Sequence, residues 1–142
     1  MIGLDTNILV RFVTHDDPAQ AAVADRVMAA RTTRDKGYVP QLVQAELWWV
    51  LRRAYSKSAR DVTRFLAELL ASDNLLFEKP EDLAWALDQT PAGADLADLL
   101  IAREVSRHAD RTLTFDQQAA SLGFGLVLPD QTSATAPAGQ GG

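Results

Sequence analysis

Four acidic residues of this chain stand beside apolar segments. Asp5 directly follows the apolar stretch IGL, and Asp116 follows the stretch TLTF. Glu46 lies inside the segment QLVQAELWWVL, and Asp98 directly precedes the run LLIA. An unpaired charge at the edge of a core is costly, so each acid either has a partner or serves a function.

Together these acids suggest a metal site. Carboxylates that converge from separate segments repel each other unless a cation lies among them. The chain has no cysteine and only two histidines, and oxygen ligands suit Mg²⁺ or Mn²⁺. Such ions activate water and stabilise charge in phosphoryl transfer and phosphodiester hydrolysis. The sequence therefore favours metal-dependent chemistry on a phosphate ester.

Each acid also has a purely structural interpretation. Asp5 could hydrogen-bond within its own turn, and Asp116 could cap the helix QQAASLG. Asp95 lies three residues before Asp98, on the same face of one helix, and could be either a helix cap or a ligand. Taken singly, the structural interpretation is favoured for most of these acids, whereas the set as a whole favours a shared site.

Glu46 is harder to explain structurally. At helical spacing it shares a face with Leu42, Trp49 and Val50, which predicts that its side chain points toward protein and needs a partner. The same spacing predicts Trp49 in the core and Trp48 over a groove or an interface.

The elements that must position these acids alternate along the chain. Short strands are expected near residues 1–5, 37–40, 74–78, 111–116 and 124–129, and helices near 18–31, 42–54, 59–70, 81–88, 95–109 and 117–123. The stretch NILVRFV fits a helix or a continued strand. This alternation predicts an α/β domain with a mostly parallel sheet, in which sites form outside the carboxyl ends of the strands. Asp5 and Asp116 would both lie there.

Bulk properties narrow the class of protein. We expect one domain over residues 1–129 and a disordered polar tail over 130–142. The chain begins with no signal-peptide pattern and has no apolar run long enough to span a bilayer, which favours a soluble cytoplasmic protein. A net charge of −5 argues against coating nucleic acid by bulk charge, but not against an enzyme that meets it locally.

Three segments resemble a known family. They are LDTNILVRFVTHDDPAQAAVA, VPQLVQAELWWVLRRAY and GADLADLLIAREVSRHADRTLTFDQQAASLG. In this order they are similar to PIN-domain proteins, particularly the VapC-type toxins of bacterial toxin–antitoxin pairs, over roughly residues 1–129. The resemblance implies a three-layer α/β/α domain with a mostly parallel central sheet, and a Mg²⁺- or Mn²⁺-dependent endoribonuclease that hydrolyses RNA.

The family's acidic quartet carries over to residues of this chain. The resemblance implies catalytic roles for Asp5, Glu46, Asp98 and Asp116, with the metal on Asp5, Asp98 and Asp116. It implies supporting roles for Asp95, for Thr114 beside the metal, and for Asn7, which would brace the loop around Asp5.

The resemblance also implies partners. VapC-type toxins form homodimers and are held inactive by a small antitoxin that often places a basic side chain into the acidic pocket. Helices 42–54 and 59–70 are the surfaces expected for this contact. Arg11, Arg53 and Arg103 are candidates for guiding the RNA, although a solvated helix face is the favoured interpretation for each of them taken singly.

Two other classes of function stay open. A haloacid-dehalogenase-like phosphotransferase also uses a strand-end aspartate and Mg²⁺, but it needs a second acid where this chain has Asn7 and a lysine near a late strand. A non-catalytic module could use the acidic pocket to bind a basic peptide.

Overall fold

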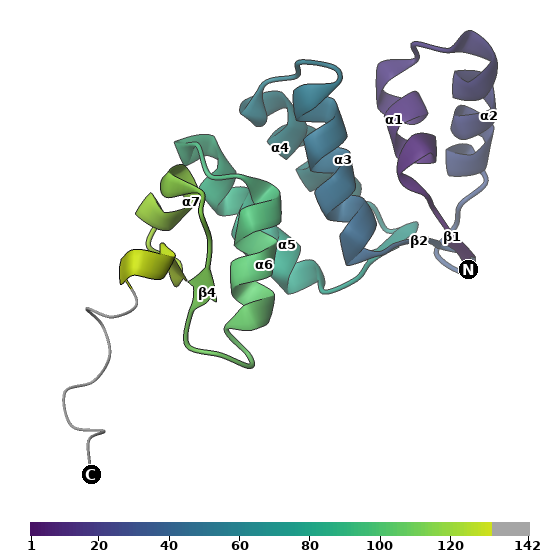
Figure 1. Cartoon of the computed structure of the whole chain (residues 1–142). Helices are drawn as coiled ribbons and strands as arrows, with labels where there is room; N and C mark the ends of the chain where they lie inside the picture. The colour runs from purple at the N-terminus through teal and green to yellow at the C-terminus, as the bar shows by residue number, and fades with distance from the viewer. Residues whose placement is uncertain (132–142) are drawn as a thin grey trace. The chain divides into compact units, whose positions relative to one another are not determined.

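Helices and short parallel strands alternate along residues 1–131, the part of the chain that this computed structural model describes (Figure 1). The chain divides into an N-terminal unit, residues 1–97, and a C-terminal unit that begins at Asp98. The elements of the N-terminal unit are β1 (Ile2–Gly3), α1 (Thr6–Thr14), α2 (Pro18–Ala29), β2 (Gly37–Val39), α3 (Gln41–Arg53), α4 (Ala59–Leu70), β3 (Leu75–Phe77), α5 (Pro80–Gln89) and η1 (Thr90–Ala92). They are followed by α6 (Leu96–Val105), in which the boundary between the units falls, and then by β4 (Thr112–Leu113), α7 (Gln117–Ser121), β5 (Leu126–Val127) and η2 (Pro129–Gln131).

The sheet of the N-terminal unit is parallel, in the order β1-β2-β3. Gly37 on the central strand pairs with Ile2 on one side and with Leu75 on the other. A Cβ atom at Gly37 would lie 2.6 Å from Leu4 Cδ1 and 2.9 Å from Leu75 Cδ2. The missing side chain therefore makes room for two buried leucines to pack over the central strand.

The carboxyl ends of β2 and β3 hold the start of α3. The N-cap of this helix is a proline that offers no side-chain acceptor, and the backbone N–H of Gln41 donates instead to Glu78 Oε2 at 2.7 Å. Gln44 is fully buried, and its Nε2 donates to the carbonyl oxygens of Val39 at 3.2 Å and Glu78 at 2.9 Å. These bonds fix the helix that carries Glu46 to the edge of the sheet.

Helices α1 and α2 form an antiparallel pair (Figure 1). The turn between them ends at Asp17, whose carboxylate accepts from the N–H of Gln20 at 3.0 Å, and Pro18 occupies the first helical position. Leu9 of α1 and Ala24 of α2 are buried. The cap and the proline explain why α2 begins here.

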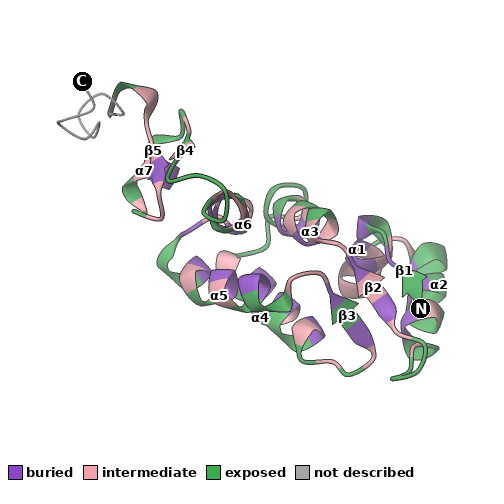
Figure 2. Ribbon diagram, turned by 90° about the horizontal axis from the view of Figure 1, so that it is seen from below, coloured by how far each residue is buried: buried purple, intermediate pink, exposed green. Residues whose placement is uncertain are grey.

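Helices α4 and α5 pack together in the N-terminal unit, with buried residues along both (Figure 2). Ser58 caps α4 by accepting from the N–H of Asp61 at 3.0 Å. Val62, Leu66 and Leu83 are almost completely buried. Val62, Leu66 and Leu69 are the buried residues of α4, and their spacing is the amphipathic pattern that predicts this helix.

The C-terminal unit contains a second parallel pair, in which Thr112 of β4 pairs with Leu126 of β5. Ala102 of α6, Ala119 of α7 and Leu126 form a small buried cluster, and Phe124 packs against it. This cluster holds α7, and hence the residue that precedes it, beside the strand pair.

These elements confirm the predicted parallel α/β class. The stretch Thr6–Thr14, which the sequence left between helix and strand, is helical, and the side chains of Asp17 and Ser58 cap α2 and α4. The predicted tail lies outside the described residues, except for its first two, which end η2. None of the helices described here is long and apolar enough to cross a membrane.

Candidate functional site

Asp5 lies between β1 and α1 and occupies the N-cap position of the helix. Its backbone carbonyl accepts from the N–H of Ile8 at 3.1 Å, but its side chain makes no cap hydrogen bond. The side chain is exposed, and within residues 1–131 its carboxylate has no hydrogen-bond or ion-pair partner. The turn role that the sequence left open for this carboxylate is therefore not seen, and both of its oxygens are available to an external group.

Glu46 lies on the exposed face of α3, so the prediction that it points toward protein is wrong. Leu42 and Trp49, which share its face, are 84% and 54% exposed. The buried face of the helix consists of Gln44, Leu47, Trp48 and Leu51. Glu46 has no hydrogen-bond or ion-pair partner in the described part of the chain, so its carboxylate is as available as that of Asp5.

The two tryptophans of α3 exchange their predicted places. Trp48 is 2% exposed, whereas Trp49 points outward. Buried indole N–H groups need an acceptor, and that of Trp48 donates to Asp95 Oδ2 at 3.3 Å. The Arg52 guanidinium lies 6.0 Å from the centre of the Trp48 ring. These contacts explain why Trp48 is the one that turns inward.

Asp95 precedes α6 and uses both carboxylate oxygens within the N-terminal unit. Oδ1 accepts from the N–H of Ala97 at 2.9 Å, which is a helix cap, and Oδ2 accepts from the Trp48 indole. Of the two roles that the sequence left open for this acid, the geometry favours the cap.

Two further acids of the predicted quartet belong to the C-terminal unit. Asp98 is half-buried in the first turn of α6. Asp116 caps α7, with Oδ1 accepting from the N–H of Ala119 at 3.0 Å. Its own N–H donates to Thr114 Oγ1 at 3.0 Å, so the predicted supporting hydroxyl orients the loop that carries the acid.

Asp5 and Glu46 thus belong to one unit, and Asp98 and Asp116 to the other. Within residues 1–131 no group of three or more histidine, cysteine, aspartate or glutamate side chains lies close enough together to hold a metal ion. The chemistry of these side chains still fits Mg²⁺, because all four are carboxylates and, within residues 1–131, Asp5 and Glu46 have no hydrogen-bond or ion-pair partner.

Glu78 is a functional-site candidate that the sequence reasoning missed. It follows β3 as Asp5 follows β1, and it is half-buried. Its carboxylate replaces a side-chain cap for α3, so its role is to position Glu46. The signal was present in the stretch NLLFE, where a predicted strand again ends on an acid.

Arg11 belongs to a hydrogen-bonded network between α1, α2 and the end of α3. Its Nε donates to Gln20 Oε1 at 2.7 Å, and its Nη1 donates to Asp16 Oδ1 at 3.1 Å and to the Tyr55 hydroxyl at 2.9 Å. The Tyr55 hydroxyl in turn donates to Asp16 Oδ2 at 2.6 Å. This bond, together with Thr14 and the Arg11 charge, holds the pKa of Asp16 below its usual range.

The other supporting residues lie on helix surfaces. Asn7 is exposed on the first turn of α1 and its side chain makes no hydrogen bond within the described residues, so the predicted bracing of the Asp5 loop is not seen. Arg53 and Arg103 are exposed in the last turns of α3 and α6.

The elements are those of a parallel α/β fold, and Asp5, Glu78 and Asp116 lie within three residues of the ends of its strands. The family model of the PIN domain matches residues 2–125, and the chain belongs to this family. No curated protein matches the chain. PIN domains are generally metal-dependent nucleases, which agrees with an enzyme of the hydrolase type and weighs against the haloacid-dehalogenase alternative.

Proposed function

We propose that this protein is a Mg²⁺-dependent endoribonuclease that acts as the VapC-type toxin of a toxin–antitoxin pair. The observation that carries the proposal is the PIN domain match over residues 2–125, because it includes every member of the acidic quartet. The carboxylates of Asp5 and Glu46, which have no partner among residues 1–131, support it. Acidic side chains without protein partners add no stability to the fold, which favours a functional role for them.

Each residue has a distinct role in this proposal. Asp5, Asp98 and Asp116 would hold the ion, and Glu46, on an exposed helix face, would accept a proton from the attacking water. When bound, Mg²⁺ would polarise water and offset the charge of the scissile phosphate. Thr114 keeps the Asp116 loop in place through the backbone N–H. Arg53 and Arg103 would steer the RNA backbone.

The proposal includes two protein partners, a second copy of the chain and a cognate VapB-type antitoxin. The exposed Leu42 and Trp49 flank Glu46 on α3 and would suit an apolar segment of either partner. A basic side chain from the antitoxin beside Glu46 would satisfy the carboxylate and compete with the ion.

An RNA cleavage assay tests the proposal. The purified chain should generate new RNA ends in Mg²⁺ and none in EDTA, and sequencing the ends would identify the substrate. Asp98→Ala should abolish cleavage, whereas Asp73→Ala, an exposed acid between α4 and β3, should leave it unchanged. Cleavage by the Asp98→Ala variant at the wild-type rate would contradict the assignment.

A growth assay tests the role as a toxin. Expression of the chain alone should arrest growth, and Asp5→Ala should relieve the arrest. If the chain instead binds basic peptides and cleaves no RNA under any metal condition, the non-catalytic alternative is correct.

A further inference from the structure

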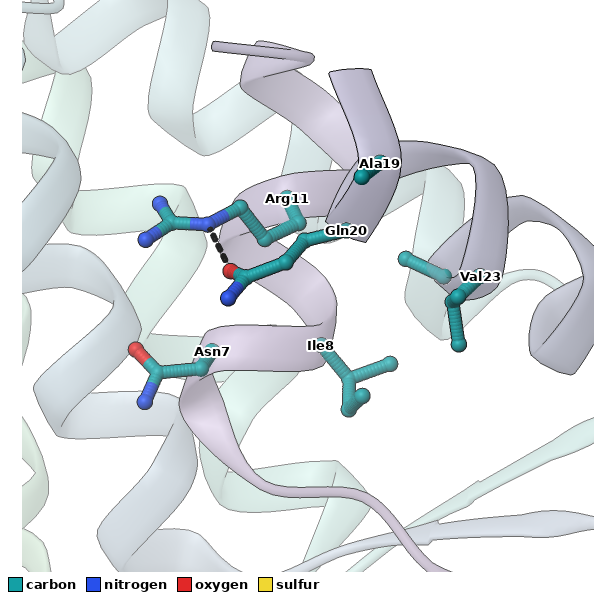
Figure 3. Close-up of a pocket in the computed structure, with 7 residues that line it drawn as sticks. Asn7, Ile8, Arg11, Ala19, Gln20 and Val23 are labelled. Atoms are coloured by element: carbon teal, nitrogen blue, oxygen red, sulfur yellow. Dashed lines mark hydrogen bonds between the residues drawn. The ribbon is translucent and has the colours of Figure 1, made fainter. Parts of the chain in front are cut away.

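An open pocket of about 510 Å³ lies between α1 and α2, and the proposed mechanism does not use it. This volume lies within the range of roughly 300–1,000 Å³ that is typical of small-molecule sites. Figure 3 shows its polar side chains, Asn7, Arg11 and Gln20, toward one end and Ile8 and Val23 toward the other. The pocket therefore combines an apolar wall with a cluster of hydrogen-bonding groups.

Hydrogen bonds fix which groups the pocket presents. Gln20 Oε1 accepts from Arg11 Nε, so the Gln20 amide must present its Nε2 donors to an occupant. The Asn7 amide makes no hydrogen bond within the described residues and can both donate and accept. The polar end thus offers fixed donors from one amide beside an adaptable amide.

The charge balance excludes a phosphate as the preferred occupant. Arg11 Nη1 is engaged by Asp16 and by the Tyr55 hydroxyl, so its charge is already balanced. Aspartates 5 and 17 lie near the two ends of the pair and would repel an anion. A neutral, flat group with acceptors along one edge fits better, because it can lie against Ile8 and Val23 while it accepts from Gln20.

We propose that this pocket binds one unstacked base of a single-stranded RNA. Side-chain amides are suited to read base edges, and single-stranded RNA is recognised through bases that leave the stack and pack on flat or apolar surfaces. Asn7 lies on the helical turn that begins directly after Asp5, so a base held here belongs to a nucleotide close to that acid. The inference rests on the proposed ribonuclease function and adds a site that selects the sequence to be cut.

Gln20→Glu is the sharpest test of the pocket. The glutamate keeps an acceptor for Arg11 Nε and stands at the third helical position after the Asp17 cap, where an acid is favourable. It replaces only the donors that face the pocket. Ala22→Glu adds the same charge to an exposed position of α2 outside the pocket and is the matched control.

The experiment measures binding of the full chain to labelled single-stranded RNA pentanucleotides that differ only in the central base, with EDTA present to prevent cleavage. The wild type should prefer one base by about tenfold, as expected for one good base-edge contact. Gln20→Glu and Asn7→Ala should lose this preference, and Ala22→Glu should keep it. Equal binding of all four RNAs by the wild type, or an unchanged preference in Gln20→Glu, would overturn the inference.

This test is separate from the test of the nuclease. Base-selective binding that Gln20→Glu removes, in a chain that cleaves no RNA with Mg²⁺, would support the pocket and contradict the proposed function. RNA cleavage with a sequence preference that Gln20→Glu leaves unchanged would support the proposed function and contradict the role of the pocket.

Discussion

Asp5 and Asp116 occupy corresponding positions in the two units, yet their carboxylates differ. Each follows a short parallel strand and stands at the N-cap of the next helix. Asp116 accepts the N–H of Ala119, as a cap normally does, whereas the Asp5 side chain makes no cap bond. Asp5 stands at an N-cap position but does not contribute the stabilising hydrogen bond that a cap normally makes, which points to another use of its charge.

The acids of this chain differ in how many of their carboxylate oxygens have a partner within the protein. Asp95 uses both oxygens within the protein, Asp116 uses one, and Asp5 uses none within residues 1–131. An acid with a full set of protein partners contributes to stability, and one without them is available for a ligand. This order predicts which substitutions affect activity and which affect folding.

The largest effect is expected for Asp5→Asn. The change removes a charge and keeps the shape, so RNA cleavage with Mg²⁺ should fall by on the order of 100-fold or more, the loss expected when a metal ligand is weakened. The thermal midpoint of unfolding should stay the same, because within residues 1–131 the side chain makes no hydrogen bond or ion pair that asparagine would lose. A variant that cleaves normally but unfolds earlier would mean that Asp5 is a structural residue after all.

Asp95→Ala should show the opposite behaviour. It removes the α6 cap and leaves the buried Trp48 indole N–H without its acceptor, at a combined cost of about 2 kcal/mol in the free energy of unfolding. Urea denaturation measures this loss, and cleavage at a temperature where the variant stays folded should remain within a few-fold of the wild type. Trp48→Phe should destabilise the protein in the same direction and leave Asp95 as a cap. A complete loss of cleavage in the folded Asp95→Ala variant would identify Asp95 as a ligand.

Much of the fold could be predicted from local sequence signals. The caps Asp17 and Ser58 and the alternation of apolar runs with turns mark elements by interactions between residues close in the chain. The role of Glu78 could not be predicted in this way. It caps α3 across a separation of 37 residues, and only the pairing of β2 with β3 brings the two together.

The orientation of α3 shows where periodicity fails. Each face of the helix carries a tryptophan. The buried face also carries Gln44, and the hydrophobic pattern would predict such a polar side chain on the exposed face. Gln44 can be buried because its amide donates to two strand-end carbonyls. The four acids could be selected from the sequence by type and position, but which of them are free depends on hydrogen bonds that the pattern does not encode.

Asp116→Ala tests the acid that uses one of its two carboxylate oxygens within the protein, and a smaller effect is expected for it. Loss of one cap bond should lower the free energy of unfolding by about 1 kcal/mol, whereas Asp116→Asn, whose side-chain oxygen can still cap, should cost much less. Amide hydrogen exchange at Ala119 would detect the change within the C-terminal unit. Asp5→Ala is the matched comparison and should leave exchange in α1 unaltered. Equal losses from the two alanine variants would remove the distinction between the two positions.

The smallest effect concerns Asp16, an acid that owes its low pKa to protein partners. The hydrogen bond from Tyr55 is the largest cause, and the folded-state pKa lies below the ordinary value of 3.8. Ionised Asp16 therefore stabilises the fold above that value, and this contribution is lost as the pH falls through the lower, folded pKa. Tyr55→Phe should raise the Asp16 pKa toward 3.8 and slightly weaken the fold at neutral pH.

An NMR titration of the Asp16 carboxyl group measures this shift. Tyr38→Phe is the control, because the Tyr38 hydroxyl makes no hydrogen bond among the residues described and its loss should leave Asp16 unchanged. If Tyr55→Phe leaves the Asp16 pKa where it is, the lowered value comes from Thr14 and the Arg11 charge. Tyr55 would then serve only to orient Arg11, and the network beside the α1–α2 pocket would depend on the ion pair between Arg11 and Asp16.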